Sequence, residues 1–145
     1  MSALLLTREP LDVASALAAV AGPAHGATAV FTGSTREDDA GPHAIVALFY
    51  DAYPEMAFGI LEALADDVAA RFGAVLSVHH RLGEVPVGET ALVVAAGAPH
   101  RAEAFAACRY AMERITHEVP IWKQDVRADG TREWRDGMAA IGSAR

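Results

Sequence analysis

Apolar residues recur every three or four positions in three segments of the chain, which is the spacing of one face of an α-helix. We expect helices over residues 11–18, 54–72 and 99–116. A proline stands at or just before the start of each segment, where its fixed backbone is well tolerated. The predicted buried face of the first helix is Leu11, Ala14, Leu17 and Ala18, and that of the second is Met56, Ile60, Leu64 and Val68.

Short runs rich in β-branched and aromatic residues separate these helices and predict strands. The expected strands are residues 4–7, 27–32, 43–50, 74–82, 90–96, 120–126 and 131–134. We place 120–126 at a sheet edge because Pro120 lacks a ladder donor, and we expect loops over 33–42 and 83–89. The order predicts one α+β domain over residues 1–136 with a mixed or antiparallel sheet, followed by a flexible tail over 137–145.

The composition fits a globular protein and narrows its partners. The chain has 145 residues, 52% of them hydrophobic, and a net charge of −7, which argues against disorder and against broad nucleic-acid binding. A small basic pocket for an anionic ligand stays compatible with this charge. The start of the chain has no basic segment before its short leucine run, and no apolar stretch is long enough to span a membrane. We therefore expect a soluble, cytoplasmic protein.

Two motifs resemble nucleotide-binding or metal-binding sequences, but neither has the features that such a site requires. Residues 83–90 imitate a phosphate-binding loop, but Glu89 takes the place of the lysine and a strand is predicted where a helix should start. His79 and His80 are neighbours on a predicted strand, so they point to opposite faces. The single cysteine, Cys108, excludes an internal disulfide and lies among apolar residues, as a small buried side chain does. We expect no metal site.

Arg36 is the first candidate for anion binding. It follows a predicted strand and has the hydroxyl residues Ser34 and Thr35 beside it. A guanidinium group presents a fork of donors that suits phosphate or carboxylate. The alternative is an exposed loop arginine that pairs with Glu37 or Asp38.

A second candidate is the pair His100 and Arg101 at the start of a predicted helix, where free N–H groups and the helix dipole favour anions. The alternative is an ordinary solvated first turn. A third candidate is Lys123, the only lysine among twelve basic residues, which follows an apolar segment and a tryptophan. A lysine packed by apolar groups can serve as acid, base or nucleophile. The alternative is a surface lysine that only packs its stem on an edge strand.

Six short motifs in order resemble the large, catalytic subunit of molybdopterin synthase. They are residues 26–36 (GATAVFTGSTR), 50–57 (YDAYPEMA), 80–89 (HRLGEVPVGE), 99–108 (PHRAEAFAAC), 119–123 (VPIWK) and Trp134. The resemblance implies an α+β fold with an α/β hammerhead part. It also implies a sulfurtransferase in molybdenum-cofactor synthesis, which needs no cofactor of its own and acts on cyclic pyranopterin monophosphate. The sulfur donor would be the C-terminal Gly-Gly thiocarboxylate of a small ubiquitin-like subunit, and two large subunits would form the central dimer of a heterotetramer.

The resemblance also implies roles for individual residues. Lys123 would line the site where the donor tail and the pterin meet, and His100 and Arg101 would bind the substrate phosphate from the opposite protomer. The implied substrate-binding residues are Ser34, Thr35, Arg36, His100, Arg101, Gln124 and Asp125.

One position departs from the family pattern. The family usually has a second, catalytic lysine seven residues before Lys123, and Thr116 stands there in this chain. Threonine carries no charge. Arg114 or His117 is the alternative source of a cation; on a regular helix both point away from position 116, and fraying near Pro120 would relax this objection for His117. Two hypotheses follow: an active synthase subunit with a rearranged site, or a non-catalytic relative that binds the pterin or the small subunit without sulfur transfer.

Overall fold

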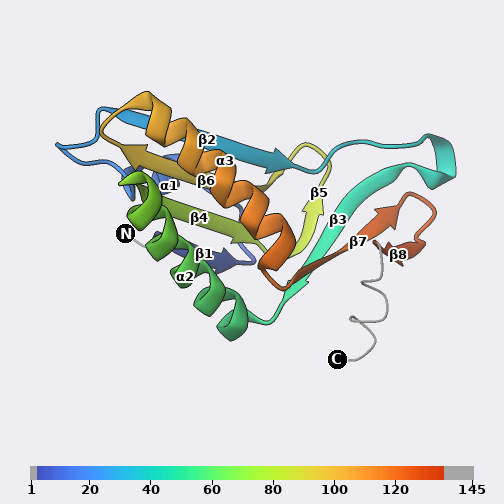
Figure 1. Ribbon diagram of the computed structural model, residues 1–145. Coiled ribbons are helices and arrows are strands. Elements are labelled where there is room, and N and C mark those ends of the chain that lie inside the picture. The colour runs from blue at the N-terminus through green and yellow to red at the C-terminus, as the bar shows by residue number, and fades with distance from the viewer. Residues whose placement is uncertain (1–2, 136–145) are drawn as a thin grey trace.

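The computed structural model describes residues 3–135, which form two four-stranded sheets and three α-helices (Figure 1). The first sheet has the order β1(Leu4–Thr7), β4(Val75–Arg81), β6(Thr90–Ala98) and β2(Ala27–Ser34). The second sheet has the order β5(Gly83–Pro86), β3(Ile45–Ala52), β7(Ile121–Arg127) and β8(Arg132–Trp134). Only β1 and β4 pair in parallel, whereas every other pairing is antiparallel. The predicted α+β class with mixed and antiparallel sheets is confirmed.

The helices cover both faces of the first sheet. The long helices α2(Pro54–Phe72) and α3(Arg101–Glu118) lie side by side over one face (Figure 1). The short helix α1(Val13–Ala18) packs against β4 and β6. Gly97 of β6 permits this approach, since a Cβ atom there would collide with the carbonyl oxygen of Val20 just after α1.

The main core lies between the first sheet and the two long helices. Leu61, Leu64 and Val68 of α2 meet Val78 and Val94 of the sheet, and all five are buried. Cys108 is buried in the same core, as its apolar neighbours predict. Helix α3 contributes mainly alanines to this layer, which lets it lie close to the sheet.

The predicted buried faces of two helices are partly wrong. In α2 the buried positions begin at Ala57 and Leu61, while Met56 is 58% exposed. A strict four-residue repeat rotates by about 40° around a helix at each step, so it cannot follow one face for five turns. In α1, Asp12 caps the helix through its carboxylate. The buried side chains there are Ala16 and Val20, whereas Ala14 and Ala18 are exposed.

Two strand predictions also need correction. Residues 83–86, expected within a loop, form β5 and pair with β3 of the second sheet. Residues 121–127 form β7, which lies between β3 and β8 and is not an edge strand. Pro120 lies just before β7, so the backbone N–H that proline lacks is not needed by this strand. A single 3-10 turn, Gly41–His43, interrupts the loop before β3.

The predicted tail over residues 137–145 lies outside the described residues. None of the helices in residues 3–135 is both long enough and apolar enough to cross a membrane.

Candidate functional site

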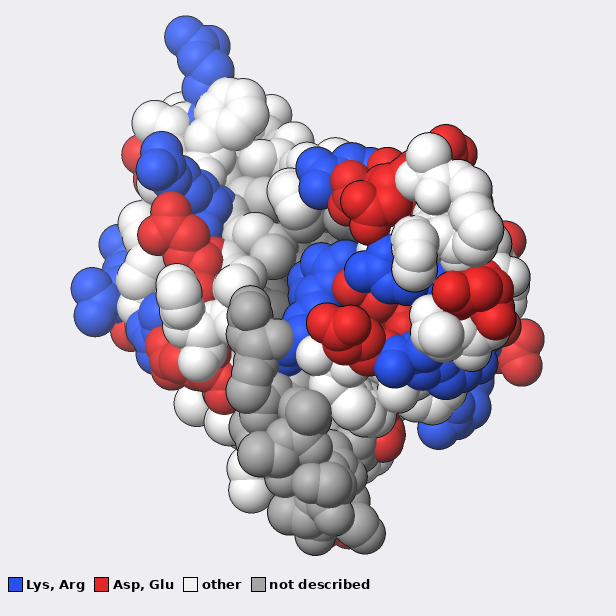
Figure 2. Space-filling model, turned by 90° about the vertical axis from the view of Figure 1, so that its right-hand side faces the viewer, with Lys and Arg blue, Asp and Glu red and all other residues white. Residues whose placement is uncertain are grey.

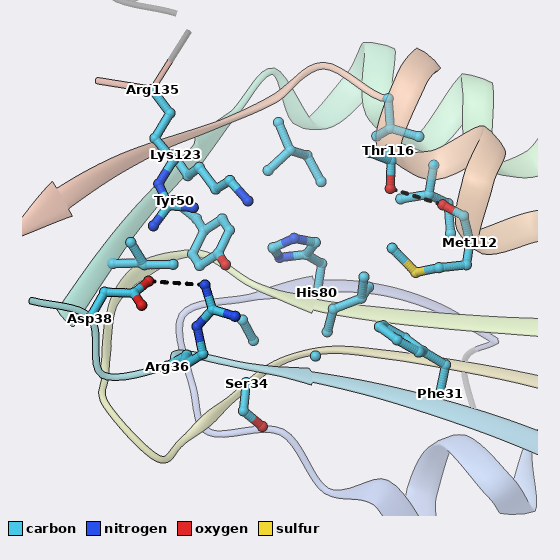
Figure 3. Close-up of a pocket in the computed structure, with 17 residues that line it drawn as sticks. Phe31, Ser34, Arg36, Asp38, Tyr50, His80, Met112, Thr116, Lys123 and Arg135 are labelled. Atoms are coloured by element: carbon cyan, nitrogen blue, oxygen red, sulfur yellow. Dashed lines mark hydrogen bonds and ion pairs between the residues drawn. The ribbon is translucent and has the colours of Figure 1, made fainter. Parts of the chain in front are cut away.

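A cavity of about 430 Å³ opens where the C-terminal end of α3 meets the two sheets. Its floor and walls come from β2, β3, β4, β6, α3 and β7 (Figure 3). The polar side chains that line it are Ser34, Arg36, Asp38, Tyr50, His80, Thr116, Lys123 and Arg135. Phe31, Met112 and Ile121 are among the apolar residues of its wall. The cavity therefore combines an apolar wall with a few convergent cations, as small-molecule sites do.

Four of the predicted site residues come together in this cavity: Ser34, Arg36, Thr116 and Lys123. They arrive from three elements that are far apart in the sequence, namely the end of β2, the last turn of α3 and the middle of β7. Figure 3 shows Lys123 and Thr116 entering from different sides, with Arg36 across the cavity from both.

Lys123 lies on β7, an interior strand of the second sheet, which fixes its backbone. It pairs with Tyr50 of β3, and its strand is bordered by β8 on the other side. Its side chain is half-buried and extends into the cavity (Figure 3). This placement differs from a lysine on an edge strand that only packs its stem against the surface.

Arg36 combines the two alternatives raised by the sequence. Its Nη2 atom donates to Oδ2 of Asp38 at 3.1 Å, and its side chain is 82% exposed. It also lines the cavity. An exposed ion pair of this kind is weak, so an incoming anion can compete with Asp38 for the guanidinium group.

Thr35 points away from its neighbours Ser34 and Arg36. It is 2% exposed, and its hydroxyl oxygen has no hydrogen-bond partner within residues 3–135. Its backbone N–H donates to the carbonyl of Glu89 at 3.1 Å, and its carbonyl accepts from Gly88 at 2.9 Å. These bonds tie the end of β2 to the turn before β6, so Thr35 holds the loop from behind the cavity.

His80 is a cavity residue that the sequence interpretation did not include in the site. It is buried, and its Nδ1 atom lies 2.8 Å from the carbonyl oxygen of Arg81. Burial lowers the His80 pKa to about 4, and the nearby Lys123 acts in the same direction. The neutral ring must donate from Nδ1 because a carbonyl only accepts, which leaves Nε2 as an acceptor. Its membership of the site could have been suspected from strand alternation, which puts His79 and His80 on opposite faces.

Tyr50 packs edge-on against His80, with 4.8 Å between the ring centroids. Burial raises the pKa of the Tyr50 hydroxyl, and the positive charge of Arg135 partly opposes this effect. Tyr50 therefore stays a neutral donor on the cavity wall at physiological pH.

Arg135 is the second cavity residue that was missed. It follows β8 and lies next to Tyr50 in Figure 3. Its Nε atom donates to Oδ1 of Asp125 at 2.6 Å, and its backbone N–H donates to the carbonyl of Lys123 at 3.1 Å. No sequence motif marks this position, because the pairing of β7 with β8 brings it to the cavity.

Gln124 and Asp125 do not line the cavity. Gln124 accepts a hydrogen bond from Arg132 at 3.2 Å. Asp125 is buried, accepts from Arg135 and lies 3.7 Å from the guanidinium of Arg127. Gln124 and Asp125 therefore lie behind the site, where their side chains accept hydrogen bonds from arginine side chains.

His100 and Arg101 lie at the opposite end of α3 from Thr116. Along a regular helix, fifteen residues separate Arg101 from Thr116 by about 22 Å. Both side chains are on the surface, and His100 lies 3.7 Å from Glu103. Within one chain they are not part of the cavity.

Neither neighbour of Thr116 supplies a cation in its place. Arg114 contacts Glu118 and Tyr110 of its own helix and Asp67 of α2, and it does not line the cavity. His117 is exposed and does not line the cavity. The Thr116 hydroxyl donates to the carbonyl of Met112 at 3.0 Å, within its own helix (Figure 3).

The charge around the cavity is positive although the chain is acidic. Arg36, Lys123 and Arg135 line it against one carboxylate, that of Asp38. Figure 2 shows acidic and basic side chains mixed over this side of the molecule, with basic groups in the recess at the centre of the view. Residues 3–135 contain no cluster of three or more His, Cys, Asp or Glu side chains that could hold a metal ion. The arrangement suits an anionic organic ligand.

Comparison with known proteins assigns the family. The model of the MoaE protein family matches residues 6–118. The chain belongs to the MoaE family. It is 44% identical over 132 residues to molybdopterin synthase catalytic subunit 1 of Mycobacterium tuberculosis, covering 89% of this chain and 87% of the relative. It is 39% identical over 131 residues to the molybdopterin synthase catalytic subunit of Nostoc, covering 89% and 79%.

Solved structures of this family have the same fold. The crystal structure of molybdopterin synthase from Staphylococcus aureus matches with a TM-score of 0.88 and 32% identity, over 94% of this chain and 98% of that chain. A protein–protein complex of subunits 1 and 2 of the molybdopterin-converting factor from Helicobacter pylori matches with a TM-score of 0.77 at 24% identity, over 93% and 91%. The resemblance to the large subunit of molybdopterin synthase, and the function class it implies, are confirmed.

Proposed function

We propose that this chain is an active sulfur-transfer subunit that converts cyclic pyranopterin monophosphate to the dithiolene of molybdopterin. The observation that carries the proposal is the cavity itself, where Lys123 and Arg36, both at family positions, converge. Lys123 is held at this place between two strands and supplies a fixed positive charge there. The cytoplasmic location expected from the sequence stays a prediction.

Lys123 is the residue we place at the reacting atoms. Release of the sulfur requires a nucleophile, here water, to add to the acyl carbon of the donor tail once its sulfur is bonded to the pterin. Negative charge develops on the acyl oxygen during this addition, and a preorganised ammonium group in a partly dry site stabilises it. The carbon–sulfur bond then breaks, so that the sulfur stays on the pterin and the tail leaves as a carboxylate. His80 stays uncharged beside Lys123 at physiological pH, so it does not repel the ammonium group. Its Nε2 can accept a hydrogen bond from the lysine or from a ligand hydroxyl.

Arg36 and Ser34 would bind the pterin. Arg36 offers its donor fork to the anionic substrate after releasing Asp38, and Ser34 adds a hydroxyl at the end of the same strand. The apolar wall that includes Phe31 and Met112 would cover the planar ring system.

The sulfur donor we propose is a small ubiquitin-like subunit with a C-terminal Gly-Gly thiocarboxylate. A fold neighbour from Helicobacter pylori is described as a complex of two converting-factor subunits. A Gly-Gly tail has no side chains, so it can enter a cavity with an apolar wall. The cations of the cavity would attract the negatively charged end of the tail.

We propose that a second copy of the chain completes the site with His100 and Arg101. Strand β2 is an edge of the first sheet, and beside it lies a hollow of about 370 Å³ between β2 and α3. Val30, Phe31 and Phe105 line this hollow and are exposed, Phe105 by 68%. If two copies meet here with their α3 helices antiparallel, the start of one α3 lies beside the end of the other. This arrangement spans the separation of about 22 Å within one chain.

A single-turnover assay tests the proposed function. The chain is mixed with the thiocarboxylated small subunit and cyclic pyranopterin monophosphate, and sulfur incorporation is followed by mass spectrometry. We expect transfer by the wild type and its loss in Lys123→Ala, at least 100-fold if Lys123 stabilises the developing charge as an oxyanion donor does, which is worth roughly 10²–10³. Unfolding temperature controls for the fold, and Arg71→Gln, on α2 and outside the cavity, controls for loss of one charge.

Two results would contradict this proposal. Wild-type turnover in Lys123→Ala would remove Lys123 from the reaction. No transfer by wild type, together with transfer by Thr116→Lys, would identify a binding-competent relative that lacks one catalytic group.

A further inference from the structure

The α3 side of the cavity carries no positive charge in this chain. Thr116 stands where the resemblance expects a lysine, and its hydroxyl is committed to the carbonyl of Met112. The basic side chains that line the cavity come from the loop after β2, from β7 and from the segment after β8. A site that binds an anionic substrate and an anionic donor tail must therefore obtain its charge from those sides.

Arg135 is built into the cavity wall. Its backbone N–H bonds to the carbonyl of Lys123 at 3.1 Å, which extends the β7–β8 ladder by one residue. Its Nε atom is held at 2.6 Å by Asp125, a carboxylate that is 9% exposed. Asp125 is in turn close to Arg127. Arg135 is thus anchored at both its backbone and its side chain.

The way Arg135 is anchored leaves its binding edge available. A guanidinium group has five N–H donors, of which Asp125 takes the one on Nε. Within residues 3–135, the ion pair of Arg135 with Asp125 runs through this atom, so the two terminal amino groups are left for a ligand. Its charge also acts inside the cavity, because it opposes the effect of burial on Tyr50.

We propose that Arg135, oriented by Asp125, is an anion-binding residue of this site and supplies the positive charge that the family's lysine would bring at position 116. This inference rests on the proposed function. The ligand chemistry is an anionic oxygen group, which could belong to the pterin phosphate or to the end of the donor tail. Arg135 acts as a fixed fork, whereas Lys123 acts as the point charge at the reacting atoms.

Charge replacement in both directions tests the proposal in the single-turnover assay. We expect Arg135→Gln to slow transfer by about 10- to 150-fold, the worth of a hydrogen bond to a charged group. Arg135→Lys should recover part of that loss. Thr116→Lys added to Arg135→Gln should restore the rate to within a few-fold of wild type, because it returns a cation to the same cavity from α3.

Arg132→Gln is the matched control. Arg132 lies three residues away on β8, and it pairs with Glu84 at 2.9 Å outside the cavity. We expect this variant to keep the wild-type rate within about twofold, as for a surface ion pair.

Equilibrium binding distinguishes the two sources of the anion. Calorimetry measures the affinity of wild type and Arg135→Gln for cyclic pyranopterin monophosphate and, separately, for the unmodified small subunit with a Gly-Gly carboxylate. A selective loss for one ligand identifies the anion that Arg135 holds. These measurements do not need turnover. If Arg135→Gln binds a ligand more weakly while the wild type transfers no sulfur, the proposed function is refuted and the role of Arg135 in anion binding stands.

Asp125→Asn tests the orienting contact. If Asp125 acts through Arg135, its replacement weakens the same ligand, and adding it to Arg135→Gln causes no further loss of affinity. A purely structural role would give additive losses and a lower unfolding temperature in both backgrounds.

Three outcomes would overturn the inference. The first is wild-type rate and affinity in Arg135→Gln. The second is an equal loss in Arg132→Gln. The third is a loss in Arg135→Gln that neither Arg135→Lys nor Thr116→Lys repairs, which would show that the position matters for packing and not for charge.

Discussion

At the scale of single residues, the positions in the site that could be predicted from the sequence are those with unusual chemistry. Lys123 is the only lysine of the chain and Arg36 follows a strand beside two hydroxyl residues, and both line the cavity. His80 and Arg135 were missed, because their roles arise from burial and from a pairing between β7 and β8 that no local pattern encodes. Thr35, in contrast, sits beside Arg36 but faces inward.

The buried histidine makes stability depend on pH. His80 has a pKa of about 4 in the folded chain against 6.5 normally, so between these values the unfolded chain binds a proton that the folded chain does not. Stability therefore falls as pH drops from about 6.5 to 4, by about 3 kcal/mol at most from this group, and changes little below that.

Denaturant unfolding at pH 7, 5.5 and 4.5 measures this effect. We expect His80→Gln to remove much of the pH dependence, whatever its effect at pH 7, whereas His117→Gln, at an exposed position, should leave it in place. An unchanged pH dependence in His80→Gln would show that His80 is not the group responsible.

At the scale of elements, the long periodic segments and most of the strands were predicted well, whereas β5 was missed. Helix α2 and the strands of the first sheet follow from spacing and β-branched runs. Strand β5 has four residues, begins with a glycine and ends with a proline, so its sequence predicts a turn. It forms because β3 offers a partner across a large sequence distance. Tertiary pairing thus outweighs local propensity at this corner.

Two glycines test that interpretation in opposite directions. Gly83 opens β5 with φ of 82°, and a Cβ atom there would lie 2.9 Å from Nη1 of Arg8. Gly83→Ala should therefore lower the free energy of unfolding by about 1–3 kcal/mol. Gly59, in the middle of α2, has open space around it. Gly59→Ala should raise that free energy by about 0.5–1 kcal/mol. Equal effects of the two substitutions in denaturant unfolding would contradict the positive-φ constraint at Gly83.

At the scale of the whole molecule, one chain supplies only part of the predicted anion site. The cavity holds Arg36, Lys123 and Arg135, while His100 and Arg101 stand at the far end of α3. The exposed apolar side chains beside the β2 edge lie between these two places along the helix, as a shared interface requires. The sequence could name Arg36 and Lys123 of the first group and both residues of the second, but the distance between the groups became known only from the fold.

Complementation between two inactive variants tests whether the site is shared. Lys123→Ala keeps Arg101, and Arg101→Ala keeps Lys123, so each homodimer has two damaged sites. When the two variants are unfolded together and refolded, half of the dimers should combine both chains, and each of these has one site with Lys123 and Arg101 both intact. The mixture should then recover about a quarter of the wild-type single-turnover amplitude at the wild-type rate, as random pairing in a two-fold dimer requires.

Adding Phe105→Glu to both chains should abolish the recovery by placing a charge on the apolar face, and light scattering should show monomers. A mixture no more active than its two components, although it forms dimers, would place Arg101 outside the partner's site.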